Sequence, residues 1–347
     1  MAALVSLAKP DAPLPDAPLI VLCGPTASGK TALALALAEQ FSGEIISCDS
    51  VAVYRGMEIG TAKPTLAERA RVPHHLIDIL TPDQPCTAGD YARLGREAIA
   101  GITQRRVAYA SPGDAWNLQN PTAYTREARP GRHEVLPIVA GGTGLYLRAL
   151  LDGLFAAPQR HEPLREKLRQ RDPAKLHRIL IRLDPSAAKL IHANDTPKII
   201  RAIEVTLAAR QPMTRQWEQG REPLTGYRVL RLGLNPPRAA LYDKINRRAY
   251  EMFDRGLVEE TTQLVETYGF ECRAFTSLGY AQAIGVLRNE LTREEAVTLT
   301  AQGHRNYAKR QLTWFRKDAE IQWLPSFGGD AEAIQQACDL VAAHLDQ

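Results

Sequence analysis

The motif that most constrains the fold lies near the N-terminus, where residues 24–31 read GPTASGKT. This matches the pattern G-x-x-x-x-G-K-[ST] of a phosphate-binding P-loop. The apolar run at 19–23 before it predicts a buried parallel strand, and residues 31–41 after it predict a helix. Between a strand and a helix, inward backbone N–H groups and the helix N-terminus attract phosphate oxygens. The chain is therefore predicted to bind a nucleotide or another diphosphate.

Every residue of the motif is expected to lie against phosphate. The predicted phosphate-binding residues are Gly24, Pro25, Thr26, Ala27, Ser28, Gly29, Lys30 and Thr31. Lys30 would neutralise phosphate charge, and the Thr31 hydroxyl suits a Mg²⁺ ligand. The loop alone does not separate ATP from other diphosphates, and its default interpretation is a kinase or another ATP-binding NTPase.

Further strands and helices alternate along the chain. Apolar runs at 44–48, 136–140 and 227–235 predict three more buried strands, and the first is followed directly by Asp49 and Ser50. This alternation, with polar residues at strand ends, predicts an α/β fold with a doubly wound parallel sheet. The chain beyond the last of these strands is expected to be mainly helical.

These patterns divide the chain into a P-loop core and an insertion. Residues 1–18 are rich in Pro, Ala and Asp, and predict a disordered tail. The core is expected to comprise 19–156 and 225–347, with the long aperiodic stretch 107–135 as a surface loop. Residues 157–224 carry helical periodicity and predict a basic, helical insertion domain.

The insertion holds the excess positive charge. Residues 157–215 contain 13 Lys and Arg against 6 Asp and Glu, a local net charge of +7. The whole chain carries +4, so the remainder is at −3. A basic block in a near-neutral chain favours a polyanionic partner, and a solvated helical face is the alternative.

Other features bear on the compartment. No apolar run approaches the roughly 20 residues that a membrane helix needs, and the N-terminus lacks the basic start and apolar core of a secretory signal. The five cysteines are far apart and form no C-x-x-C pair, so neither a zinc site nor a disulfide is indicated. We therefore expect a cytoplasmic, monomeric protein with no membrane partner.

Four more motifs narrow the choice among P-loop proteins. The chain reads DSVAVYRGMEIGTAKP at 49–64, VPHHLID at 72–78, GGTGLY at 141–146 and YAKRQLTW at 307–314. With the P-loop, and in this order, they resemble the tRNA dimethylallyltransferase (isopentenyltransferase) family over about residues 19–323. The resemblance implies that a dimethylallyl group passes from dimethylallyl diphosphate to the N6 amine of the adenine just 3′ of a tRNA anticodon. It also implies Mg²⁺ as the cofactor and the tRNA anticodon stem-loop as the partner.

The resemblance assigns three catalytic residues. Asp49 would take the proton from the attacking amine, and the alternatives are that it caps the next element or binds magnesium as in an NTPase. Thr143 would contact the target nucleotide, or else cap the helix that follows. Arg248 would assist the leaving diphosphate, although Lys244 stands where the family usually has arginine, and Arg247 is equally well explained as an exposed helix charge.

The same resemblance assigns a set of tRNA contacts. The predicted tRNA-binding residues are Asp49, Ser50, Val51, Ala52, Thr143, Arg165, Pro197, Lys198, Arg201, Gly279, Tyr280, Gln282, His304, Arg305, Lys309, Arg310 and Gln311. The segment 304–317 is basic and aromatic, as single-stranded RNA binding requires, although its aromatic residues more commonly belong to a core. Pro197 and Lys198 replace a glutamine and an arginine of the family pattern, and lysine loses bidentate geometry. The insertion is accordingly expected to bind the anticodon stem.

Two functions of other classes stay open. One is an ATP-dependent small-molecule kinase with the same core fold, and the other is an RNA-binding module whose P-loop only regulates. A kinase would not need the basic and aromatic helix near the C-terminus. A binding module would not need Asp49 and Thr143 at strand ends, so the transferase explains more of the sequence.

Overall fold

The computed structural model of the protein describes residues 16–105, 135–155, 158, 160–218 and 220–347. The chain divides into two compact units. The insertion unit is Leu151–Leu224, and the core unit is the remainder. Residues 1–15 of the predicted tail and 107–134 of the predicted surface loop lie outside the described residues.

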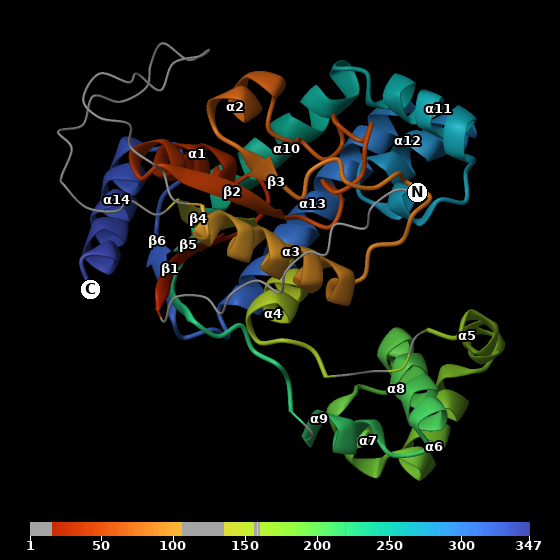
Figure 1. The fold of residues 1–347 in the computed structure, drawn as a ribbon. Coiled ribbons are helices and arrows are strands. Elements are labelled where there is room, and N and C mark those ends of the chain that lie inside the picture. The colour runs from red at the N-terminus through yellow and green to blue at the C-terminus, as the bar shows by residue number, and fades with distance from the viewer. Residues whose placement is uncertain (1–15, 106–134, 156–157, 159, 219) are drawn as a thin grey trace, which may run out of the picture. The chain divides into compact units, whose positions relative to one another are not determined.

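The core unit is built on a six-stranded sheet (Figure 1). Its strands are β1 (Ala17–Cys23), β2 (Gly43–Cys48), β3 (His74–His75), β4 (Leu136–Gly141), β5 (Tyr227–Leu234) and β6 (Ile321–Leu324). Their order across the sheet is β3-β2-β4-β1-β5-β6, and every pair is parallel. With helices against both faces, the predicted α/β fold with a doubly wound parallel sheet is confirmed.

The sequence-based prediction misses the edges of this sheet. The strands β3 and β6 are only two and four residues long, too short to give a hydrophobic period. The predicted tail boundary at residue 18 is wrong, because Ala17 and Pro18 already pair with Tyr227 and Arg228 of β5. Composition suggested a tail there, but the ladder of backbone hydrogen bonds extends the strand.

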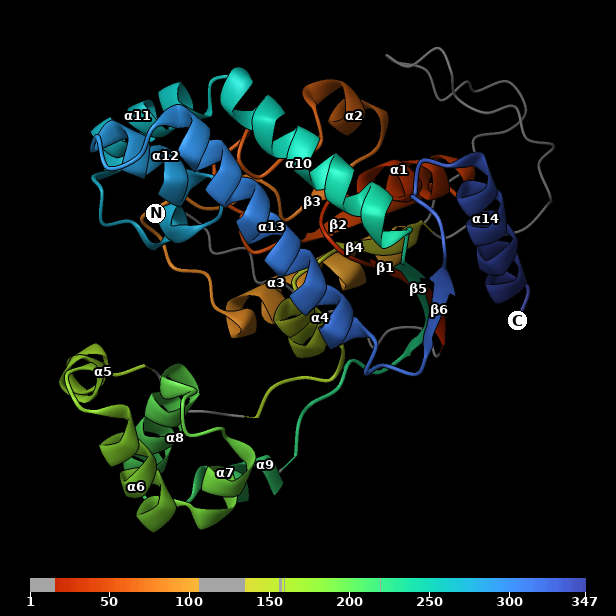
Figure 2. The ribbon, with the colours of Figure 1, turned by 180° about the vertical axis from the view of Figure 1, so that it is seen from behind.

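Helices pack against the sheet, and further helices lie beyond one end of it (Figures 1 and 2). They are α1 (Lys30–Gln40), α2 (Leu66–Arg71), α3 (Ala88–Thr103), α4 (Gly144–Leu151), α10 (Arg238–Asp254), α11 (Leu257–Tyr268), the 3₁₀ helix η1 (Arg273–Thr276), α12 (Tyr280–Leu287), α13 (Arg293–Phe315) and α14 (Ala331–Leu345). The long helices α10 and α13 lie side by side. None of the helices in the described part of the chain is long and apolar enough to cross a membrane.

Two large hydrophobic cores, among the clusters of the described residues, stabilise this unit. The first lies between α1, α14 and the sheet, and contains the fully buried Leu33, Leu37, Ile138 and Leu232. The second joins α10–α13 to the segment after β2, and its members include Val53, Met57, Phe275 and Tyr280. Burial of each such side chain contributes roughly 1.5–3 kcal/mol. The second core fixes the chain beyond Asp49 against the C-terminal helices.

The strand order concentrates the predicted site residues at one edge of the sheet. The connection after β1 runs to β2 on one side of it, whereas the connection after the neighbouring strand β4 runs to β5 on the other side. Open α/β sheets bind ligands at the carboxyl ends of strands beside such a reversal. The P-loop, Asp49 and Thr143 follow β1, β2 and β4 respectively, so all three meet there.

The insertion unit is a separate helical domain. Its helices are α5 (Glu162–Arg169), α6 (Pro173–Leu183), α7 (Pro185–Leu190), α8 (Thr196–Ala209) and α9 (Met213–Glu218). Aspartates cap three of them, since the carboxylates of Asp172, Asp184 and Asp195 accept hydrogen bonds from the first turns of α6, α7 and α8. Leu176, Leu180 and Ile199 are fully buried between the helices.

Candidate active site

The P-loop connects the end of β1 to the start of α1. Gly29, its last residue before the helix, has a φ of 89°, which favours glycine. A Cβ at this position would also lie 2.9 Å from the backbone nitrogen of Gly328. The Gly328 N–H donates to the Ser28 carbonyl at 2.9 Å, so the loop after β6 supports the P-loop from outside.

Lys30 is held by the P-loop itself. Its Nζ donates to the Pro25 carbonyl at 2.7 Å. Burial lowers the pKa of Lys30 to about 8, and the neighbouring charge of Asp49 opposes that shift while Arg248 adds to it. A bound anion would stabilise the charged ammonium and reverse the effect of burial.

A cavity of about 370 Å³ opens beside the P-loop. Its lining residues are Thr26, Ala27, Gly29, Lys30, Thr31, Asp49, Thr61, Ala62, Gly142, Lys244, Arg247, Arg248, Glu251, Tyr307 and Gln311. A smaller cavity of about 90 Å³ shares Lys30, Thr31, Asp49, Thr61 and Ala62 with it. The larger cavity therefore combines the phosphate-binding loop with the strand-end residue Asp49 and with Gly142 of the turn after β4, whereas Thr143 is not among its lining residues.

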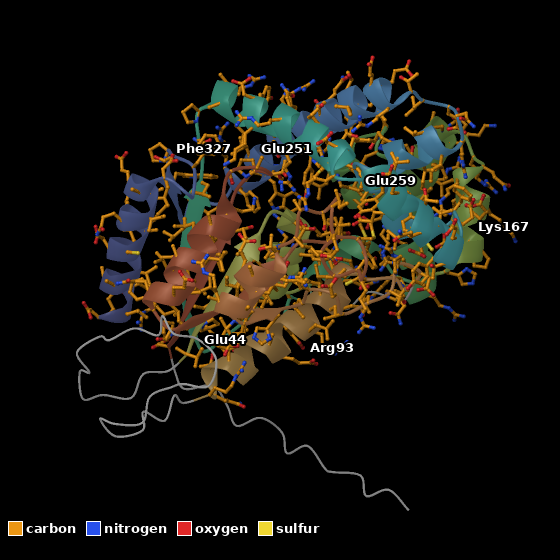
Figure 3. All side chains as sticks on the ribbon, turned by 90° about the horizontal axis from the view of Figure 1, so that it is seen from above. Glu44, Arg93, Lys167, Glu251, Glu259 and Phe327 are labelled. Atoms are coloured by element: carbon orange, nitrogen blue, oxygen red, sulfur yellow. The ribbon has the colours of Figure 1, made fainter. Side chains whose placement is uncertain are left out.

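Cations outnumber carboxylates in this cavity. Four residues of α10 line it together: Glu251, which is labelled in Figure 3, and Lys244, Arg247 and Arg248. Their spacing of three and four residues places them on one face of the helix. Arg247 is exposed, as the sequence suggested, but it also lines the cavity, and its spacing of three residues from Lys244 and four from Glu251 was the available signal. With Lys30, four cationic side chains line the cavity, which suits a diphosphate.

Arg248 is half-buried, and its hydrogen bonding is incomplete. Its guanidinium donates to the Thr26 hydroxyl and to the Thr61 carbonyl, both at 3.4 Å. Its Nε is buried without a partner, as is the Ser28 hydroxyl of the P-loop. Burial lowers the pKa of Arg248, whereas the charge of Asp49 raises it. Buried polar groups are normally satisfied, so these open donors favour an anionic ligand between them.

Asp49 lines both cavities. One carboxylate oxygen accepts from the backbone N–H groups of Val51 at 2.8 Å and Ala52 at 3.3 Å. The capping role considered from the sequence is therefore present. Since Asp49 also lines the cavity, the same carboxylate is available to a substrate.

The Thr143 hydroxyl does not form the hydrogen bond to the following helix that an N-cap side chain would form. The hydroxyl accepts from the Ser50 N–H at 3.1 Å, which ties the turn after β4 to the turn after β2. The first N–H groups of α4, from Tyr146 and Leu147, bond instead to the Thr143 carbonyl. Tyr307, on α13, lines the cavity, and Thr143 itself is not among the lining residues.

Gln311 joins the P-loop to the turn after β4. Its Oε1 accepts from the Thr26 N–H at 2.8 Å, and its Nε2 donates to the Gly142 carbonyl at 2.8 Å. Any Cβ at Gly142 would overlap the Gln311 amide. The side chain is only 5% exposed. In the structure Gln311 thus connects the P-loop to the turn after β4 within the cavity wall. Only a ligand inside the cavity can contact it there.

The residues present also fit Mg²⁺. This ion prefers oxygen ligands and usually keeps several waters while it bridges substrate phosphates. The Thr31 hydroxyl lines the cavity beside Asp49, and no hydrogen bond of the described residues occupies it. Thr31 would hold the ion together with phosphate oxygens and water.

The predicted tRNA-binding residues of the core unit fall into two groups. Lys309 and Arg310 are exposed on α13, and Arg305, on the same helix, bonds to Asn246. In contrast, Ala52, Gly279 and Tyr280 are buried, which argues against direct contacts with tRNA. The other predicted residues of this unit that remain partly accessible are Ser50, Val51, Gln282 and His304.

His304 also differs from the prediction that the basic segment 304–317 binds RNA. Both of its ring nitrogens are buried and have no hydrogen-bond partner. Burial, together with the nearby charge of Arg248, lowers the pKa of His304 to about 4. The ring is therefore neutral at physiological pH and supplies no charge to RNA. The aromatic residues of that segment are divided, because Phe315 is buried whereas Trp314 is 37% exposed.

Two predicted tRNA contacts in the insertion unit are ion-paired internally. Arg165 and Arg201 both contact the carboxylate of Glu204, at 3.2 Å and 2.5 Å, and the Glu204 side chain is fully buried. These arginines therefore have a structural role that the sequence did not indicate. Pro197 and Lys198 are exposed at the start of α8, and within the described part of the chain Lys198 pairs only with Asp195.

Comparisons with known proteins agree with this geometry. The profile of the IPP transferase family matches residues 52–109 and 114–318, and that of the Isopentenyl transferase family matches residues 17–76. The chain is 56% identical to the tRNA dimethylallyltransferase of Koribacter versatilis over 330 residues, covering 94% of this chain and 98% of that one. It is 47% identical to that of Solibacter usitatus, covering 95% and 100% of the two chains.

Solved structures give the same answer. The tRNA isopentenylpyrophosphate transferase of Bacillus halodurans is 34% identical, with a TM-score of 0.65 and coverage of 95% of this chain and 97% of that one. A eukaryotic dimethylallyltransferase acting on tRNA has a TM-score of 0.76 over 95% of this chain and 80% of that one, and at 24% identity it shows the shared fold alone. The chain belongs to the tRNA dimethylallyltransferase family of IPP transferases.

Proposed function

We propose that the protein transfers a dimethylallyl group from dimethylallyl diphosphate to the N6 amine of the adenine 3′-adjacent to the tRNA anticodon. One observation carries the proposal. A single cavity is lined by a P-loop lysine, a half-buried arginine with an open donor and a strand-end aspartate. Membership of the tRNA dimethylallyltransferase family supports the same reaction.

The diphosphate would bind where the cavity is most cationic. Lys30 and the P-loop N–H groups would take its terminal oxygens, and Arg248 would donate to the oxygen that leaves the allylic carbon. Mg²⁺ bound at Thr31 would neutralise further charge on the diphosphate. Because Arg248 also bonds to Thr26 and Thr61, its guanidinium is already oriented before the substrate arrives.

The acceptor adenine would enter beside Asp49 and Thr143. A base that reacts inside a pocket has to be unstacked from its neighbours first. As the amine nitrogen bonds to the allylic carbon, the carbon–oxygen bond to diphosphate breaks and the amine loses one proton. Asp49, which lines the cavity, would take this proton, and Thr143 would hold the amine. Products are the modified tRNA and free diphosphate.

Incubation with labelled dimethylallyl diphosphate and total tRNA, with labelled ATP in a parallel reaction, tests this function. We expect the isoprenoid label in tRNA and one diphosphate released per transfer. Hydrolysis of ATP without tRNA, and no label in tRNA, would support the kinase instead. The relatives named above are transferases, and none supports a kinase.

The pKa of Lys30 predicts a pH dependence of substrate binding. In the free protein this pKa is lowered to about 8, so the ammonium is charged below that pH and increasingly neutral above it. The bound diphosphate favours the charged form, so binding above pH 8 requires uptake of a proton. The Kd for dimethylallyl diphosphate should rise about tenfold per pH unit there and stay nearly constant between pH 6.5 and 7.5.

Calorimetry across this pH range would measure the effect. Lys30→Arg provides the control, because a guanidinium stays charged over the whole range and should flatten the profile even if affinity drops. A Kd for the wild type that stays constant up to pH 9.5 would contradict the lowered pKa of Lys30 in the free protein.

Lys309 tests the tRNA surface of the core unit. It is exposed on α13, and none of the ion pairs found among the described residues involves it. Phosphate contacts release counterions, so Lys309→Ala should weaken tRNA binding and lower the slope of log K against log salt by roughly 0.7–0.9. Lys309→Arg keeps the charge and should keep the slope. If the alanine variant binds tRNA like the wild type at every salt concentration, tRNA does not contact this position.

A further inference from the structure

Of the predicted tRNA contacts, Tyr280 is the one whose position in the structure agrees least with direct binding to tRNA. It is the first residue of α12, and its side chain is fully buried. Its hydroxyl donates to the Glu260 carboxylate at 2.6 Å and accepts from the Gly60 N–H at 3.3 Å. The ring packs so closely on Gly60 that a Cβ there would overlap it. No surface of this side chain is open to RNA.

Glu260, on α11, completes the arrangement. Its carboxylate accepts from the Ile59 N–H at 3.0 Å and from the Glu58 N–H at 3.2 Å. Three consecutive N–H groups, of residues 58 to 60, are therefore held by Glu260 and Tyr280 together. Burial and the adjacent Glu260 raise the pKa of Tyr280, so its hydroxyl keeps its proton and remains a donor to Glu260.

The segment that these two side chains hold leads directly into the active site. The next residues, Thr61 and Ala62, line both cavities. The Thr61 carbonyl accepts from the Arg248 guanidinium at 3.4 Å, and Arg248 in turn bonds to Thr26 of the P-loop. Tyr280 lines neither cavity, so it can act on the reaction only through this backbone.

We propose that Tyr280 and Glu260 are positioning residues that fix the turn at residues 58–60, so that the Thr61 carbonyl orients Arg248 toward the leaving diphosphate. This inference rests on the proposed function, because it assigns Arg248 to the diphosphate. It replaces a direct tRNA contact at Tyr280 by an indirect effect on catalysis. The second core, in which Tyr280 packs with Met57 and Phe275, keeps the two helices and the turn together.

Tyr280→Phe is the variant that separates the two roles, since it removes only the hydroxyl and keeps the buried ring. A misplaced catalytic group of this kind costs about tenfold in rate, and up to about 10²-fold for a shift near 1 Å. We expect the single-turnover rate to fall by about tenfold and the Kd for dimethylallyl diphosphate to rise, while the Kd for tRNA and its salt slope stay at the wild-type values. Tyr250→Phe, at a tyrosine that is 58% exposed on α10, is the matched control and should change nothing.

A double-mutant cycle with Arg248→Lys shows whether the effect passes through Arg248. Once Arg248 is replaced, losing the Tyr280 hydroxyl should cost less than twofold, because coupled residues are not additive. Glu260→Gln keeps one acceptor oxygen and should give a smaller loss of the same kind, and it carries the test if the phenylalanine variant unfolds. The thermal midpoint of each variant is measured alongside.

Three results would overturn the inference. One is weaker tRNA binding with an unchanged rate at saturating tRNA, which is the behaviour of a direct contact. Another is full additivity with Arg248→Lys, and the third is wild-type behaviour of both Tyr280→Phe and Glu260→Gln. Failure of the wild-type protein to prenylate tRNA at all is a distinct outcome, and it would refute the proposed function instead.

Discussion

Asp49→Asn should lower the single-turnover rate of dimethylallyl transfer by about 10²-fold or more, while both substrates still bind. The asparagine side chain keeps a carbonyl oxygen that can accept from the Val51 and Ala52 N–H groups, as the carboxylate does. The turn after β2 is therefore preserved. What the amide loses is the capacity to take a proton from the attacking amine.

Rapid-quench measurements with saturating tRNA and labelled dimethylallyl diphosphate would report this rate directly. Asp243→Asn, at an exposed position of α10, removes a carboxylate outside the cavity and should react like the wild type. If Asp49→Asn also reacts at nearly the wild-type rate, Asp49 is only a cap, and the base must be sought elsewhere in the cavity.

The second large effect is expected at Lys30. Its ammonium is buried and would form charge-assisted hydrogen bonds to phosphate, which contribute roughly 1.5–3 kcal/mol each. Lys30→Ala should therefore raise the Kd for dimethylallyl diphosphate by about 10–100-fold. The Kd for tRNA should stay within about twofold of the wild type, because that ligand binds largely through other side chains.

ATP serves as the comparison ligand in the same titrations. In the wild type it should compete poorly with dimethylallyl diphosphate, because the proposed donor substrate is an allylic diphosphate. Tight ATP binding that also depends on Lys30 would favour a nucleotide-dependent enzyme, and equal binding of dimethylallyl diphosphate by wild type and Lys30→Ala would remove the P-loop from the substrate site.

Sequence patterns were sufficient for the parts of the molecule that depend on local order. The P-loop, the strands β1, β2, β4 and β5 and the residues at their ends follow from short apolar runs and glycine spacing, and the structure has them at these positions. The parallel order of the strands then brings Lys30, Asp49 and Thr143 to one edge of the sheet. Each inference needed only neighbouring residues and a general rule of α/β folds.

What the sequence could not predict depends on contacts between distant segments. Gln311 meets Thr26 across 285 positions, and Tyr280 meets Gly60 across 220. Sequence periodicity does not reveal such pairs. A motif therefore does not distinguish a residue with a buried structural role from one that contacts RNA. The pairing of Arg165 and Arg201 with Glu204 is hidden in the same way, because one buried carboxylate serves two arginines from different helices.

That pairing changes how the insertion unit should be studied. Removing one partner of a buried ion pair costs about 3–5 kcal/mol, because a charge is left without compensation. Loss of tRNA binding in an Arg201→Ala variant would therefore not identify a tRNA contact. The exposed Lys198, which among the described residues pairs only with Asp195, is the better position at which to ask whether this unit binds the anticodon stem.

The most direct test of the central claim is to locate the transferred group on the RNA. An anticodon stem-loop with adenine next to the anticodon, and a second one with guanine at that single position, are each incubated with the protein and dimethylallyl diphosphate. Nucleoside mass spectrometry should find N6-(dimethylallyl)adenosine in the first RNA, and no prenylated nucleoside in the second, since guanine carries no N6 amine. Prenylation of the guanine-containing RNA, or no prenylation of either RNA while ATP is consumed, would contradict the account.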